Sequence, residues 1–209
     1  MEHIGTGPVS LQLREIIRAQ IEEGIYPPGT AIPPENELAA QYDVNRLTVR
    51  TAIGALVYEG LLKRVQGKGV YVLGEKINRD LDNLGGFTQT IRQKNAVPST
   101  RILTKALRPA GNKYALVFGI QPEDSIYYIK RICYVSDEPV SLEEVFIPHY
   151  VVPKLEGIDL SVFSLYEVYD FYHVRPKQAR QTLDLAVLEA NDARLLGISC
   201  EQAVMKTVG

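Results

Sequence analysis

Hydrophobic positions recur at helical spacing through the first sixty residues and predict three helices. The first covers 10–23, with Ser10 as its N-cap and Gly24 just after its last turn. Its apolar stripe consists of Leu13, Ile16, Ile17 and Ile21. A second, short helix is predicted over 35–42, because the prolines directly before it fit only ahead of or inside a first turn.

The third predicted helix covers 46–59, begins after Asn45 as its N-cap and ends at Gly60. Its inward stripe consists of Val49, Ala52, Ile53, Leu56 and Val57. Its outward positions are Leu47, Arg50, Thr51 and Gly54, and Arg46 and Thr48 lie at the borders between the inward and outward faces. An apolar back and an N-terminal half that presents arginines and threonines are typical of a recognition helix in a DNA major groove, although many plain surface helices also carry two arginines.

Two runs of strand-forming residues follow, 61–66 and 70–73, and they predict a hairpin. Gly67 and Gly69 allow its tip to approach another molecule closely, and Lys68 places a positive charge there. A hairpin directly after a helix–turn–helix is a wing. The first part of the chain is therefore predicted to be a winged-helix DNA-binding domain.

Charge placement supports this prediction where total charge does not. The chain has a formal net charge of −2, with 23 Lys and Arg against 25 Asp and Glu. Residues 1–43 carry seven acidic and two basic residues, and residues 44–76 carry six basic and two acidic ones. The basic stretch contains the predicted recognition helix and wing, so a local basic pole is present in a chain that is nearly neutral overall.

Other features exclude several classes of protein. Two cysteines, Cys133 and Cys200, make neither a disulfide framework nor a zinc site, and the three histidines are not at ligand spacing. The sequence shows no nucleophile–base pair, metal set or cofactor loop, so no catalytic residue, metal or cofactor is predicted. The start of the chain lacks a signal-peptide pattern, and no apolar stretch approaches the ~20 residues of a membrane span. We expect a cytoplasmic protein without a membrane partner.

Residues 8–73 resemble the N-terminal domain of the GntR family of bacterial transcription regulators. Five blocks carry the resemblance: EGIYPPG (23–29), IPPENELA (32–39), VNRLTVR (44–50), LVYEGLL (56–62) and GKGVYV (67–72). The resemblance implies double-stranded DNA as the partner. It implies DNA contacts at Arg46, Thr48, Arg50 and the wing glycines, Gly67 and Gly69. The residues themselves add Asn36, Asn45 and Lys68 as candidate DNA-binding residues. The family usually has a small hydroxyl residue where Pro34 stands and an arginine where Asn36 stands; Asn36 is able to read an adenine edge instead.

The second half alternates strands and helices. Strands are predicted over 99–107, 125–135, 140–147 and 178–187, and helices over 112–119, 163–172 and 189–196. Ser136 to Pro139 is predicted as the turn between the two central strands. Long neighbouring strands with short helices predict an antiparallel α+β domain.

Residues 86–200 resemble the effector-binding (UTRA) domain of the HutC subfamily, which shares its fold with chorismate lyase. The blocks are GFT (86–88), IKR (129–131), DEPVSLE (137–143), SLYE (164–167), QTL (181–183) and ARLLGI (193–198). The resemblance implies a pocket for a small polar metabolite, such as a sugar phosphate or another anion. The implied effector-binding residues are Phe87, Thr88, Arg131, Glu143 and Ser164. Arg131 and Glu143 are alternatively a cross-strand ion pair.

Two departures weaken the case for a phosphorylated sugar. Cys133 stands where many relatives carry a second arginine, and Gly86 where they carry a hydroxyl residue. The family domain usually continues past 193–198 into closing strands, so we expect either that strands are missing after Gly209 or that the domain closes differently. One alternative is therefore a constitutive or sensing-defective DNA-binding protein, and another is a chorismate-lyase-like enzyme.

The expected organisation is a winged helix-turn-helix domain over 1–75, a linker over 76–85 and a UTRA-like effector-binding and dimerisation domain over 86–209. The expected function is that of a homodimeric transcription regulator, a repressor, on a pseudo-palindromic operator. A small polar metabolite would modulate its binding to DNA.

Overall fold

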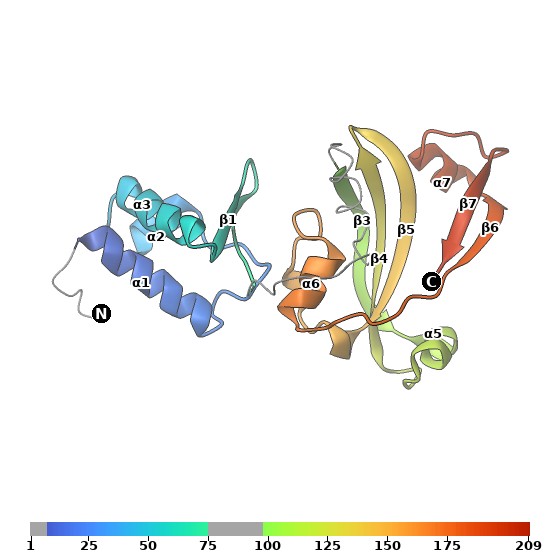
Figure 1. The fold of residues 1–209 in the computed structure, drawn as a ribbon, viewed down its shortest axis with the longest axis horizontal. Coiled ribbons are helices and arrows are strands. Elements are labelled where there is room, and N and C mark those ends of the chain that lie inside the picture. Colours follow the sequence, from blue (N-terminus) through green and yellow to red (C-terminus); the bar gives the residue numbers. More distant parts are fainter. Residues whose placement is uncertain (1–7, 75–97) are drawn as a thin grey trace. The chain divides into compact units, whose positions relative to one another are not determined.

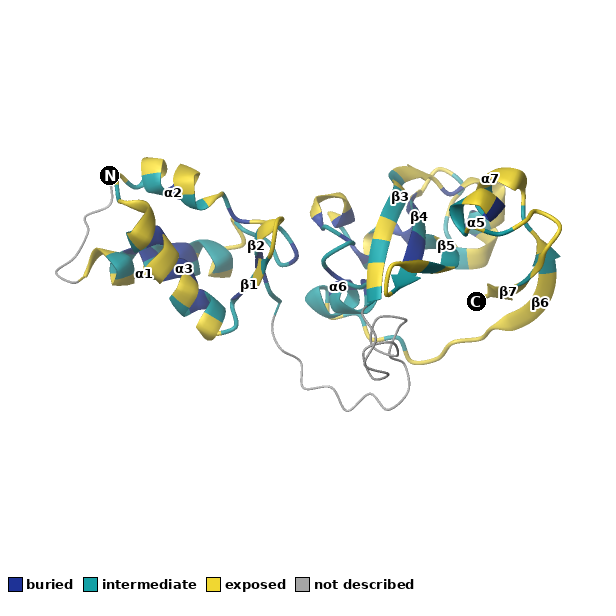
Figure 2. Cartoon of the chain, turned by 90° about the horizontal axis from the view of Figure 1, so that it is seen from above, coloured by how far each residue is buried: buried dark blue, intermediate teal, exposed yellow. Residues whose placement is uncertain are grey.

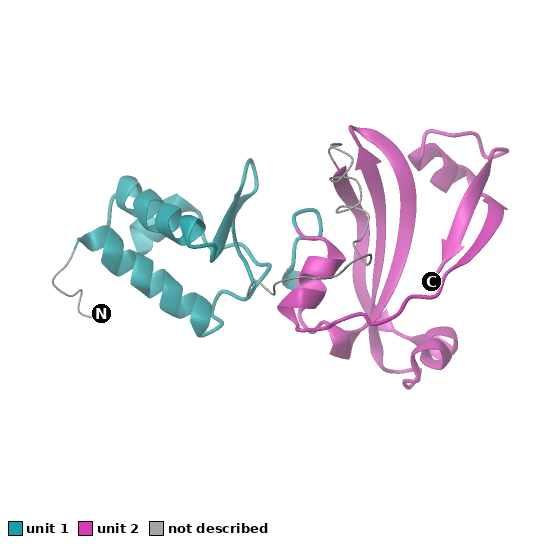
Figure 3. Cartoon of the chain, in the orientation of Figure 1, with its two compact units in different colours: residues 1–78, 157–162 teal, residues 79–156, 163–209 magenta. Residues whose placement is uncertain are grey.

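The computed structural model describes residues 8–74 and 98–209 and divides into two compact units (Figure 3). Unit 1 consists of residues 1–78 with 157–162, and unit 2 of residues 79–156 with 163–209. The predicted linker, 76–85, lies outside the described residues. The predicted domain boundaries therefore stay predictions.

Unit 1 contains three helices and a hairpin, in the predicted order (Figure 1). The helices are α1 (Val9–Glu22), α2 (Glu35–Gln41) and α3 (Arg46–Tyr58). Their apolar stripes meet in one core in which Ile17, Leu38 and Ile53 have no exposed surface. The buried sides of α1 and α3 face each other (Figure 2). This packing holds α3 by its apolar back and leaves its polar face outward.

The start of α1 differs from the prediction. Ser10 is not the N-cap, because the helix begins at Val9 with Pro8 in the cap position and no side-chain cap. The Pro8 carbonyl accepts hydrogen bonds from the N–H groups of Leu11 and Gln12, at 2.9 and 3.2 Å. The first turn therefore closes two residues earlier than Ser10 capping would require.

The predicted wing is present as strands β1 (Leu62–Val65) and β2 (Gly69–Val72), which pair antiparallel. The Lys68 N–H donates to the Val65 carbonyl at 3.1 Å and closes the turn. Gly67 has φ +73° and Gly69 φ +122°, values that favour glycine. The glycines at the tip are thus required by the turn itself, whether or not another molecule approaches them.

Unit 2 is built on an antiparallel sheet of order β3-β4-β5, formed by Pro98–Pro109, Ser125–Val135 and Glu138–Pro148. The predicted turn is shorter in the structure, because only Ser136 and Asp137 separate β4 from β5 and both have positive φ. Pro139 lies within β5, at the edge of this sheet, where a proline is tolerated.

Short helices and a second, two-stranded sheet complete unit 2. The helices are α5 (Gly111–Phe118), α6 (Leu165–Phe171) and α7 (Ala190–Leu195), and two 3-10 turns are η1 (His149–Val151) and η2 (Leu155–Gly157). Strands β6 (Thr182–Val187) and β7 (Ala203–Val208) pair antiparallel. An ion pair from Lys130 on β4 to Asp192 on α7, at 2.8 Å, connects α7 to the main sheet. The predicted antiparallel α+β class is confirmed.

Candidate functional site

The recognition helix is fixed at its N-terminus by a side-chain cap. The Asn45 Oδ1 atom accepts hydrogen bonds from the N–H of Thr48 at 2.8 Å and from its hydroxyl at 3.0 Å. This cap confirms the predicted start of α3 at Arg46. It also means that Asn45 and Thr48 satisfy each other in the free protein, so their first role is to position the helix.

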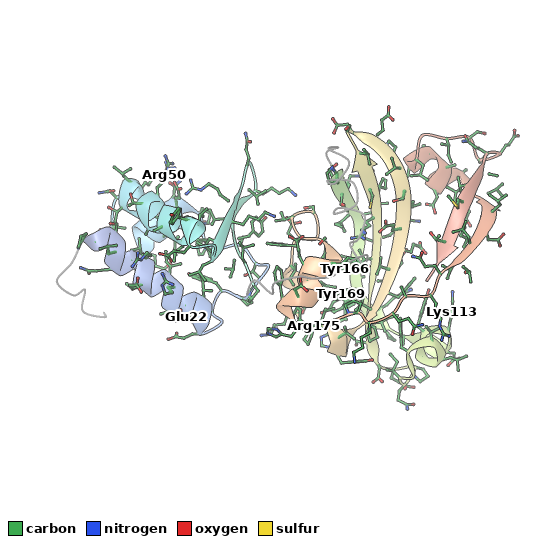
Figure 4. The ribbon with its side chains drawn as sticks, in the orientation of Figure 1. Glu22, Arg50, Lys113, Tyr166, Tyr169 and Arg175 are labelled. Carbon is green, nitrogen blue, oxygen red and sulfur yellow. The ribbon has the colours of Figure 1, made fainter. Side chains whose placement is uncertain are left out.

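The outward face of α3 carries the predicted arginines. Val49, Ile53 and Leu56 on its inner face are fully buried. The side chains of Arg46 and Arg50, in contrast, are 61% and 57% exposed. Figure 4 shows Arg50 at the outer side of α3. The helix therefore presents two guanidinium groups from its N-terminal half, close to a helix N-terminus that itself favours phosphate.

The carboxylate of Glu35 on α2 forms ion pairs with both of these arginines and with a third arginine on β1. The Glu35 side chain is only 15% exposed, and its Oε2 atom lies 3.0 Å from Arg50 Nη2 and 3.9 Å from Arg46 Nη2. Its Oε1 atom lies 3.6 Å from Nη1 of Arg64 on β1. A hydrogen bond from Arg50, together with the charges of all three arginines, lowers the pKa of Glu35. We define the basic cluster as Glu35, Arg46, Arg50 and Arg64.

The other predicted DNA-binding residues are not part of this cluster. Asn36 is exposed on α2, and Lys68 is at the wing tip. Lys68 Nζ donates to the Ser161 hydroxyl and lies 3.8 Å from Asp159 Oδ2, both in the segment 157–162 of unit 1. Burial would raise the pKa of Asp159, but hydrogen bonds from Ser161 and the charge of Lys68 lower it.

In unit 2, the predicted effector residues Arg131 and Glu143 are cross-strand partners on β4 and β5. Nε and Nη2 of Arg131 lie 2.8 and 2.7 Å from Glu143 Oε2, so the ion pair foreseen as the alternative is present. The other oxygen, Oε1, accepts from the Ser141 hydroxyl at 3.3 Å and from the Cys133 thiol at 3.5 Å. Burial raises the pKa of Cys133, and the thiol therefore stays neutral at pH 7.

Ser164, also predicted to bind an effector, is the N-cap of α6. Its hydroxyl oxygen accepts from the Glu167 N–H at 3.2 Å, and the Glu167 carboxylate accepts from the Ser164 N–H at 2.8 Å. This capping box leaves the Ser164 hydroxyl proton available to a ligand. Phe87 and Thr88, the remaining predicted effector residues, lie outside the described residues.

Several residues at these two sites were missed by the sequence prediction. Glu35 and Arg64 belong to the basic cluster, and Ser141 and Tyr169 lie near Arg131. Burial raises the pKa of Tyr169, while the charge of Arg131 acts in the opposite direction. Figure 4 shows Tyr166 and Tyr169 on α6. Ser141 lies opposite Cys133 only because the observed turn is shorter and the register shifts between Cys133 and Tyr134; the predicted hairpin would have placed it opposite Tyr134.

Two kinds of feature are absent from residues 8–74 and 98–209. No group of three or more His, Cys, Asp or Glu side chains is placed to hold a metal ion. No helix in this part of the chain is long and apolar enough to cross a membrane.

Comparison with known proteins agrees with both halves of this description. The model for bacterial regulatory proteins of the gntR family matches residues 9–72, and the UTRA domain model matches residues 93–208. The transcriptional regulator YurK of Bacillus subtilis is 32% identical over 95% of this chain and 83% of its own length. The transcriptional repressor NagR of the same organism is 30% identical over 91% of this chain and 79% of its own.

A solved structure shows the same fold. PhnF from Mycobacterium smegmatis aligns with a TM-score of 0.56 and 24% sequence identity, covering 93% of this chain and 85% of its own. The winged helix-turn-helix and the antiparallel effector-domain fold predicted from the sequence are thereby confirmed. The chain belongs to the GntR family, with a HutC-type UTRA domain, and is a DNA-binding transcription regulator.

Proposed function

We propose that this regulator is a repressor that binds duplex DNA through Arg46, Arg50 and the wing. The observation that carries the proposal is the pair of exposed arginines on the N-terminal half of α3, the part of a recognition helix that enters the major groove. The arginine fork matches the O6 and N7 acceptors of guanine. NagR, to which the chain is similar, is named as a repressor, which supports the sign of regulation.

The proposed active form is a cytoplasmic homodimer on a pseudo-palindromic operator. Two recognition helices would then lie about 34 Å apart, one turn of DNA. Thr48 would contact the backbone, Lys68 and the wing glycines would contact the minor groove or its phosphates, and Asn36 would read an adenine. The role is regulatory rather than catalytic, in line with the relatives named above.

Selection from a random duplex pool by the purified full chain tests DNA binding. The expected result is one enriched motif with two half-sites about 10 base pairs apart, centre to centre. Its complex should weaken as salt rises, because each neutralised phosphate releases counterions. Failure to enrich any sequence would overturn the proposal of sequence-specific binding by this surface.

We further propose that Arg131, Glu143 and Ser164 bind an anionic or polyhydroxylated metabolite that changes DNA affinity. Arg131 offers a guanidinium to a carboxylate or phosphate, and Glu143 accepts from hydroxyl groups. The side chain of Arg131 is 14% exposed and that of Glu143 29%, so a ligand here would be partly withdrawn from water.

Thermal unfolding with a panel of phosphosugars, sugar acids and amino-acid catabolites tests this second proposal. A true effector should raise the melting temperature and shift the DNA-binding isotherm. If no compound does either, the constitutive form of the regulator is favoured instead.

A further inference from the structure

We propose that Glu35 determines sequence discrimination by orienting the arginines of the basic cluster, without itself contacting a base. This inference rests on the proposed DNA-binding function. Three arginines from two different elements, α3 and β1, meet at its carboxylate. The Glu35 side chain is far more buried than any of the three arginines. Its carboxylate therefore lies on the protein side of the guanidinium groups, and the guanidinium groups face the solvent.

The geometry at Arg50 explains how a carboxylate can help an arginine read DNA. Arg50 binds Glu35 through its side edge: Nε and Nη2 lie 3.2 and 3.0 Å from Oε2. A guanidinium has five N–H donors in a fixed plane, so the end edge, Nη1 with the second N–H of Nη2, stays available. That end edge is able to bind guanine O6 and N7 while the side edge stays on Glu35.

Two consequences follow for free and bound protein. The long Arg50 side chain loses part of its rotamer freedom before DNA arrives, so less is lost on binding. The cluster also has a net charge of +2 instead of +3, which weakens attraction to phosphate at any sequence. Glu35 therefore favours the correct sequence and disfavours non-specific duplex.

The chain offers a matched control two residues away. Glu37 lies on the same helix and is exposed, and no ion pair to the arginines of the cluster is found for it in the structure. Glu35→Gln and Glu37→Gln remove the same charge from α2, but only the first removes the partner of Arg50. Loss of a negative charge alone would affect both variants alike.

The test compares binding of the full chain to the selected duplex and to a scrambled duplex, by fluorescence anisotropy at fixed salt. Glu35→Gln should lower the ratio of the two affinities about tenfold, through weaker selected and stronger scrambled binding. Glu37→Gln should leave the ratio unchanged. An unchanged ratio in Glu35→Gln, or an equal fall in both variants, would overturn the proposal.

A second variant covers the case in which Glu35→Gln folds poorly, as judged by circular dichroism. Arg50→Lys keeps the charge but has no fork, and it should lose the same discrimination. Where Glu35→Gln does fold, adding it to Arg50→Lys should cause little further loss, whereas independent roles would add. If the wild-type chain binds both duplexes equally, the proposed function itself fails; if the wild type discriminates and Glu35→Gln discriminates equally well, only the role of Glu35 fails.

Discussion

Arg50 on the recognition helix and Glu35 on the preceding helix are joined by three hydrogen bonds: Nε and Nη2 of Arg50 donate to Oε2 of Glu35 at 3.2 and 3.0 Å, and Nε also donates to Oε1 at 3.4 Å. The two residues are fifteen positions apart and belong to the two helices of the helix–turn–helix. Their contact links the packing of α2 on α3 to the orientation of the arginine expected to read DNA.

The pH dependence of stability should reveal the Glu35 ion pairs. The pKa of Glu35 is lowered from its ordinary value of 4.5, chiefly by the hydrogen bond from Arg50. A carboxyl group with a lowered folded pKa stabilises the protein above its unfolded pKa, and the gain is lost as pH falls through the folded value. Wild type should therefore be more stable than Glu35→Gln at pH 7, and the difference should shrink below about pH 4.5. Urea unfolding at both pH values measures this, and a difference independent of pH would contradict it.

Removal of the recognition-helix cap should cost stability. Asn45→Ala leaves the Thr48 N–H without its acceptor and should reduce the free energy of unfolding by about 1 kcal/mol. Asn45→Ser or Asn45→Asp should restore most of the loss. Asn36→Ala, at an exposed position within α2, is the control and should change stability by less than about 0.5 kcal/mol. Equal effects of Asn45→Ala and Asn36→Ala on urea unfolding would contradict the capping role.

Lys68 at the wing tip is able to pair with Asp159 or with a DNA phosphate, and the salt dependence of DNA affinity distinguishes the two. If Lys68 leaves Asp159 to contact a phosphate, Lys68→Ala should reduce the slope of log affinity against log salt by about 0.9. Asp159→Asn should then strengthen binding, because it frees the lysine. An unchanged slope in Lys68→Ala would indicate that Lys68 stays with the 157–162 segment when DNA is bound.

The Arg131–Glu143 pair should behave as a coupled unit. Arg131→Met leaves a half-buried carboxylate without its cation and should cost roughly 1–3 kcal/mol in urea unfolding. Arg131→Met with Glu143→Gln should cost less than the sum of the two single changes. Additive losses would show that the two side chains contribute to stability independently and would contradict the coupling. An effector that uses Arg131 should fail to raise the melting temperature of either variant.

Sequence patterns were sufficient to predict the helices and strands whose bounds depend on residues close together in the chain. The apolar stripe of α3 and its cap at Asn45 specify that helix by themselves, and alternation predicts the bounds of β4 as Ser125–Val135, as observed. The prediction of Ser10 as the N-cap of α1 was wrong. Its side chain is suited to capping, but the Pro8 carbonyl accepts the hydrogen bonds that close the first turn.

The contacts that sequence patterns did not predict are those made between elements. Glu35 meets Arg64 across 29 positions, and Lys68 meets Asp159 across 91. Neither helical nor strand periodicity encodes such pairs, because they depend on how the elements pack. The basic cluster became visible only when α2, α3 and β1 were placed together.

Whether the arginine face of α3 reads base sequence is decided by the variant Arg50→Ala. The measurement is the affinity of the full chain for the selected duplex and for variants with one base pair changed at a time. Arg175→Ala removes the same charge from an exposed position in unit 2 and is the control. Arg50→Ala should lose about 1–3 kcal/mol of preference at one base pair per half-site, while Arg175→Ala keeps the wild-type preference. If Arg50→Ala retains the full preference at every position, this face of α3 does not read the sequence.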